Sequence, residues 1–111
     1  MTGAFRTGWQ PDYPSPENYL YQLYSSDAAD GNGSNDGDYK SPKFDQELAD
    51  ALSQTDESKR TAALQEAQET LLQDLPSIPL WCDNVAAVSA QNVKNVQFDY
   101  TNMPTYNTIT K

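Results

Sequence analysis

Trp9, Asp12 and Tyr13 place an indole, a carboxylate and a phenol within five residues, directly before a proline-rich helix start. A carboxylate can accept charge-assisted hydrogen bonds from a ligand, and an indole offers a large flat apolar wall. This combination suits contact with a polar small molecule or a peptide better than a folding core. Both residues also have a structural interpretation: Asp12 could bond the local backbone in an Asx turn before Pro14, and Trp9 could belong to the core.

Other kinds of chemistry find little support in the residue types present. The chain has no histidine, which excludes Ser-His-Asp, Cys-His and histidine-rich zinc sites. Its one cysteine, Cys82, follows an apolar run, and we expect it to be a buried small hydrophobe rather than a nucleophile. An enzyme would need a carboxylate pair in a cleft, for example Asp12 with Glu17, working as in a glycosidase. We therefore expect no catalytic residue, no cofactor and no metal.

Charge and hydropathy restrict the partners. Seven Lys and Arg against sixteen Asp and Glu give a net charge of −9. Nucleic acids and anionic membrane surfaces require a basic patch, so neither is an expected partner. No stretch approaches the roughly 18 apolar residues of a membrane span. Residues 1–6 lack the charged and apolar regions of a secretory signal, so we expect no export signal within this sequence.

Three helices are predicted from start signals and apolar spacing. Ser15-Pro16 and Ser41-Pro42 are both typical of an N-cap followed by proline, and they predict a helix of about ten residues and a helix over roughly 42–53. Thr55 or Asp56 should cap a third, longer helix that ends before Pro76. Its apolar stripe comprises Ala63, Leu64, Ala67, Leu71 and Leu75.

The remaining segments predict strands and loops. Alternating or continuous apolar runs indicate strands over residues 3–10, 78–82, 85–88 and 93–98. Strands, then helices, then strands predict a mixed α/β fold with the long helix packed on a sheet. Residues 25–40 are small and acidic and are expected to form a surface loop. A calcium loop counted from Asp30 fails, because Asn35 stands where the turn glycine belongs and Ser41 where the bidentate glutamate belongs.

Three motifs, in order, carry a resemblance to a known family. They are the run Gly8 to Pro16, similar to a Trp-x-x-Asp-Tyr-Pro-Asp-Pro stretch; the run Tyr39 to Asp45, followed by Asp56 to Arg60; and the run Asp74 to Trp81, similar to an acidic-x-Pro-x-Ile-Pro-Leu-aromatic stretch. On these residues the chain resembles the C-terminal part of the extracellular solute-binding proteins of ABC transporters, in the oligopeptide, dipeptide and nickel class. Ser15 replaces the second aspartate of the first motif, which loosens the ligand implied.

The resemblance implies a type II periplasmic-binding-protein fold, with helices packed on a mixed sheet. Residues 1–76 or so would form a second-lobe segment, and residues 77–111 the crossover strands and the return segment. Family members are far longer, with two lobes and an export signal, so we expect this chain to be a fragment.

The resemblance also implies site residues. Asp12 would accept the α-ammonium of a peptide, and Trp9 would form a flat wall beside it. Gln10 and Tyr13 would provide further hydrogen bonds. Trp81 falls where the family has an aromatic residue near the crossover, where a hinge or packing role competes with ligand contact.

The function implied is capture of a peptide or another small polar solute outside the membrane and delivery to an ABC permease. The full-length protein would be extracellular or periplasmic, reaching the membrane only through a lipid anchor or the permease. The alternatives are a receptor for oligosaccharides or metal complexes, and an isolated fragment without ligand affinity that self-associates through uncovered apolar faces.

Overall fold

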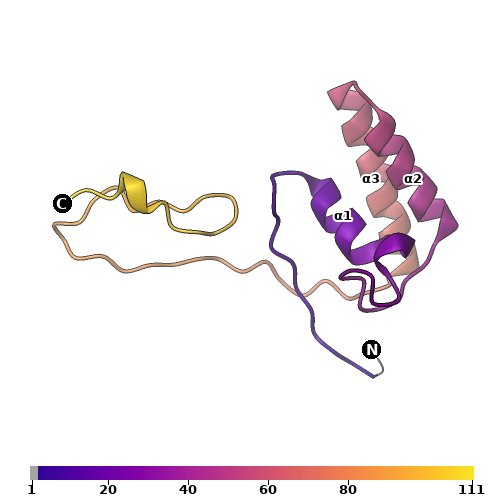
Figure 1. The fold of residues 1–111 in the computed structure, drawn as a ribbon, viewed down its shortest axis with the longest axis horizontal. Helices are drawn as coiled ribbons and strands as arrows, with labels where there is room; N and C mark the ends of the chain where they lie inside the picture. The colour runs from indigo at the N-terminus through magenta and orange to yellow at the C-terminus, as the bar shows by residue number, and fades with distance from the viewer. Residues whose placement is uncertain (1–2) are drawn as a thin grey trace.

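The computed structural model describes residues 3–111 and shows a small helical unit followed by a long irregular segment (Figure 1). The regular elements among the described residues are helical: α1 (Pro16–Tyr24), η1 (Ser26–Ala28), α2 (Pro42–Ser53), α3 (Glu57–Asp74) and η2 (Tyr106–Thr108). The three α-helices confirm the predicted helices.

Capping explains where these helices begin and end. The Ser41 side chain accepts a hydrogen bond from the Phe44 amide at the start of α2, and the Asp56 side chain accepts one from the Lys59 amide at the start of α3. Helix α3 ends at Asp74, its C-cap Leu75 has a left-handed φ of 48°, and Pro76 follows. A left-handed residue closes the last turn, and a proline cannot continue the helix.

The core lies where α2 and α3 form an antiparallel pair and α1 packs across them (Figure 1). Its buried residues come from all three helices: Leu20, Phe44, Leu48, Ala51, Leu64 and Ala67. The stripe predicted for α3 is buried at Leu64 and Ala67, whereas Leu75 is exposed. The expectation that this helix packs on a sheet is not confirmed, because within the described chain Leu64 and Ala67 pack in a core shared with α1 and α2.

The acidic segment over residues 25–40 forms a loop with many exposed residues, but part of it is buried. It contains η1, and Ser25, Ala28, Ala29 and Asn35 within it are buried. The Asn35 side chain donates to the carbonyl oxygens of Ser25 (2.9 Å) and Tyr39 (2.8 Å) and accepts from the Tyr39 amide (3.1 Å). One buried amide therefore holds the two ends of the loop together.

The predicted strands are not formed within residues 3–111. The described chain contains only two isolated antiparallel bridges, Lys94 with Thr110 and Phe98 with Pro104. Residues 3–10, 78–82 and 85–88 run without a neighbouring strand, and a strand is stable only when another strand satisfies its backbone groups. The mixed sheet is thus not confirmed, since an alternating pattern indicates a strand but not its partner.

The segment after α3 makes the molecule elongated. The radius of gyration is 17.7 Å, against about 13 Å for a compact domain of this length. Residues 77–111 lead away from the helices and fold back on themselves near the C-terminus (Figure 1). The predicted burial of Cys82 is wrong, because this residue lies exposed in the extended part. No described helix has the length and apolar character needed to cross a membrane.

Candidate functional site

Asn18 links the residues singled out before α1. This residue is 1% exposed. Its Oδ1 accepts a hydrogen bond from the Trp9 indole Nε1 (2.7 Å) and one from the Asp12 backbone amide (3.0 Å). Its Nδ2 donates to Asp12 Oδ2 at 3.3 Å. A single buried amide therefore brings Trp9 and Asp12 together.

Asp12 is an exposed residue. Its hydrogen-bond partner is the side chain of Asn18, six residues along the chain, rather than the local backbone of an Asx turn. The tight turn that follows is closed instead by the Ser15 amide, which donates to the Tyr13 carbonyl oxygen at 2.8 Å. A carboxylate with one oxygen restrained and an open side suits a cationic group arriving from solvent.

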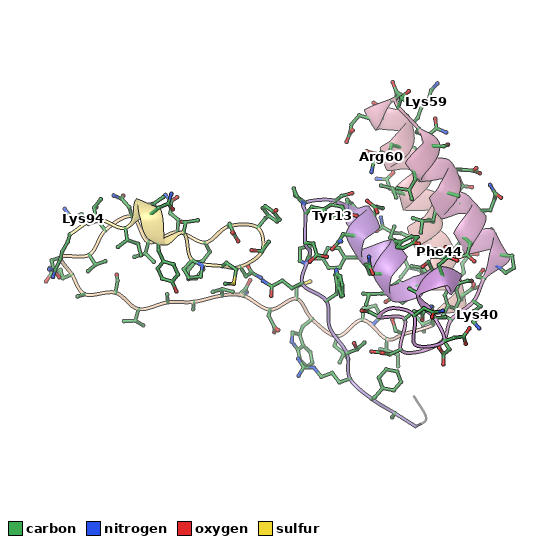
Figure 2. The ribbon with its side chains drawn as sticks, viewed as in Figure 1. Tyr13, Lys40, Phe44, Lys59, Arg60 and Lys94 are labelled. Carbon is green, nitrogen blue, oxygen red and sulfur yellow. The ribbon has the colours of Figure 1, made fainter. Side chains whose placement is uncertain are left out.

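Tyr13 lies just before α1 (Figure 2), where its side chain makes a second contact, with Glu17. The Tyr13 hydroxyl donates to Glu17 Oε1 at 2.7 Å, and this hydrogen bond, with burial as the next cause, raises the pKa of Tyr13 above its ordinary value. The other carboxylate oxygen of Glu17 lies 3.8 Å from Arg60 Nη2 of α3. Both oxygens of Glu17 thus have partners, which leaves the supposed catalytic pair of Asp12 and Glu17 without a free second carboxylate.

Gln10 and Trp81 are not held by the contacts that join Trp9 to Asp12. Gln10 is exposed. Trp81 is 61% exposed, its indole Nε1 donates to Asp83 (2.7 Å), and the Arg6 guanidinium lies 4.8 Å from its ring centroid. This cation–π contact ties the N-terminal segment to the segment that leaves α3.

Two residues near the site were missed by sequence reasoning. Asn18 is a polar residue in the first turn of α1, a position that indicates capping rather than burial. Tyr100 approaches from the far end of the chain, and its hydroxyl donates to the Asp12 carbonyl oxygen at 3.3 Å. No local signal could have predicted that contact, because it joins residues 88 positions apart.

The candidate residues lie on an open surface rather than in an enclosed pocket. A hollow of about 340 Å³ lies nearby, between the turn at Pro14 to Pro16 and the first half of α3. Its lining includes Arg60, Thr61 and Gln65 but none of the five predicted site residues. Within residues 3–111 no group of three or more acidic or cysteine side chains is arranged to hold a metal ion.

Comparison with known proteins shows what the chain is similar to. It is 36% identical over 76 residues to the periplasmic oligopeptide-binding protein OppA of Escherichia coli K12, covering 68% of this chain and 13% of that protein. It is 36% identical over 77 residues to the di/tripeptide-binding protein 1 of Pseudomonas aeruginosa, covering 69% of this chain and 14% of that protein. The sequence matches a segment of the periplasmic oligopeptide- and dipeptide-binding proteins.

Further relatives agree with this class. The oligopeptide-binding protein OppA of Bacillus subtilis is 29% identical over 91 residues, covering 82% of this chain and 16% of that protein. The chain therefore spans only about a seventh of the length of the peptide-binding relatives it matches. No protein-family model matches the chain.

Proposed function

We propose that the protein carrying this chain is the substrate-binding component of an ABC importer. It captures peptides or similar small polar solutes outside the membrane and delivers them to a permease. The observation that carries this proposal is the exposed carboxylate of Asp12 beside the indole of Trp9, in a chain similar to oligopeptide- and di/tripeptide-binding proteins. Those relatives are binding proteins by name, which favours binding without chemistry on the solute.

In this proposal Asp12 accepts the α-ammonium group of the peptide. The carboxylate offers its unrestrained oxygen, and a charge-assisted hydrogen bond in a closing cleft contributes about 1.5–3 kcal/mol. Trp9 lies beside it and provides apolar contact to the first side chain of the peptide. Gln10, Tyr13 and Trp81 are secondary candidates.

The same proposal assigns each of the two parts of the chain to a place in a two-lobed receptor. Residues 1–76 or so, which include the helical unit, would belong to one lobe of a two-lobed receptor. Residues 77–111 would cross towards the other lobe. The extended course of this second part and its exposed apolar side chains are compatible with such a role.

Peptide titration of the full-length protein tests the ammonium contact. Calorimetry with trialanine and with N-acetyl-trialanine should show binding of the first and a loss of about 10- to 100-fold for the second, because acetylation removes the cation. Asp12→Asn should weaken trialanine binding by a similar factor, while Asp50→Asn, an exposed α2 carboxylate bonded to Gln46, should leave it unchanged.

Two outcomes would contradict the proposal. Equal affinity for the free and the acetylated peptide would remove Asp12 from ammonium recognition. Mass spectrometry of the solutes that co-purify with the full-length protein should recover peptides, and the recovery of only sugars or metal complexes would favour those ligands instead.

A further inference from the structure

Asn18 is the α1 residue whose side chain contacts the candidate site. It is one of the two largest fully buried side chains, the other being Phe44 of the core. A buried primary amide must find hydrogen-bond partners, because leaving one unpaired costs more than the bond itself contributes. In this chain its partners are Trp9 and Asp12, the two residues proposed to contact the ligand.

Its three hydrogen bonds restrain three different groups: an indole ring, a backbone amide and a carboxylate. The bond from Trp9 Nε1, at 2.7 Å, determines where the indole ring lies. The bond from the Asp12 amide, at 3.0 Å, holds the backbone of the turn. The bond to Asp12 Oδ2, at 3.3 Å, restrains the carboxylate itself and leaves Oδ1 for a partner in solvent.

We infer that Asn18 is a positioning residue, which orients the Trp9 indole and the Asp12 carboxylate as one preformed ligand-binding unit. It does not touch the ligand. A group held in place before binding loses less conformational freedom when the ligand arrives, so the restraint raises affinity. This role in affinity rests on the proposed function, whereas the effect on the Trp9 indole does not.

Two substitutions separate the contacts of Asn18. Asn18→Ala removes every side-chain hydrogen bond. Asn18→Asp is nearly isosteric and keeps an oxygen that accepts from Trp9, but it removes the donor to Asp12 and places a like charge beside that carboxylate. Asn35→Ala is the matched control, since Asn35 is also buried and also makes three side-chain hydrogen bonds, none of them to Trp9 or Asp12.

The first readout is the indole N–H signals in a proton–nitrogen correlation spectrum of the 111-residue chain. Trp9 and Trp81 are the two tryptophans, and Trp81 serves as an internal reference because its partner is Asp83. Asn18→Ala should move the Trp9 signal to the position of a solvated indole and leave Trp81 in place. Asn18→Asp and Asn35→Ala should leave both signals near their original positions.

The second readout is trialanine affinity in the full-length protein. Both Asn18 variants should bind about 10- to 100-fold more weakly, as expected for loss of a hydrogen bond to a charged group, while Asn35→Ala should bind as the unmodified protein does. If the unmodified protein binds no peptide, the proposed function fails and the Trp9 signal alone tests Asn18. If it binds peptide and both Asn18 variants bind equally well, or if Asn35→Ala weakens binding as much, the inference is wrong and the proposed function stands.

Discussion

At the scale of single residues, the polar groups of buried and partly buried side chains connect separate segments of the molecule. Asn18 joins the turn before α1 to the helix, and Asn35 closes the loop between α1 and α2. Tyr39 has a similar dual character: its ring packs edge-on against Tyr24 and Phe44, with centroids 6.5 Å and 6.0 Å away, and its hydroxyl donates to Asp74 Oδ2 at 2.6 Å. It therefore connects the loop to the end of α3.

Tyr39 should make stability depend on pH in the alkaline range. Burial, followed by the hydrogen bond to Asp74, raises the pKa of Tyr39 above its ordinary value of 10.0. The folded state therefore retains the phenol proton at a pH where the unfolded chain releases it. This contribution is fully present below pH 10.0 and is lost as the pH rises through the folded-state pKa.

Urea unfolding at a series of pH values measures this effect. At pH 8 Tyr39→Phe should lower the free energy of unfolding by about 1 kcal/mol, the net contribution of one hydrogen bond. The difference between Tyr39→Phe and the unmodified chain should shrink as the pH rises above 10. Tyr106→Phe, a change at a tyrosine that is 74% exposed, is the control and should differ little at any pH. A constant difference for Tyr39→Phe across the series would contradict the prediction.

At the scale of elements, helix starts are determined by short-range chemistry. A Ser-Pro dipeptide stands at the start of both α1 and α2: the serine is the N-cap, and the helix begins at the proline. The two serines differ in one contact: Ser41 Oγ accepts from the Phe44 amide at 3.3 Å, whereas the Ser15 side chain makes no capping hydrogen bond. The two dipeptides thus allow a comparison, within one chain, of a serine that caps its helix through a side-chain hydrogen bond and a serine that does not.

Ser41→Ala should destabilise the protein by about 1 kcal/mol, because it leaves an amide of the first helical turn without its acceptor. Ser15→Ala should change the free energy of unfolding by less than about 0.5 kcal/mol, since no side-chain cap is lost. Chemical denaturation of both variants under the same conditions checks this. Equal losses would mean that the serines act through the unfolded chain or the turn rather than through the cap.

At the scale of the whole molecule, the chain divides into a packed part and an unpacked part. The three helices share one core, while the segment after Pro76 exposes most of its large apolar side chains, such as Ile78 (75%) and Val88 (101%). None of the amides of residues 78–92 donates a hydrogen bond to another described residue. Exposed apolar residues on a backbone with open hydrogen-bonding groups favour association with another surface.

Amide hydrogen exchange should report this division directly. Residues 78–92 should exchange close to the rate of an unstructured peptide, whereas the amides of α2 and α3 that lie over the core should exchange orders of magnitude more slowly. The helices are the internal control in the same sample. Strong protection of residues 78–92 would show that a partner strand covers them, and its dependence on protein concentration would tell whether that partner is a second copy.

The sequence alone determined the three helices and their boundaries, because a cap, a proline and a 3.6-residue apolar repeat all act within a few residues of one another. It also pointed to Trp9 and Asp12, through residue types and spacing. It could not determine what the long helix packs against, whether residues 78–88 find a strand partner, or that Asn18 turns inward to hold the two candidate residues. Those outcomes depend on which distant surfaces meet, and only the tertiary structure decides this, because a periodic pattern specifies the apolar face of an element but not the surface that covers it.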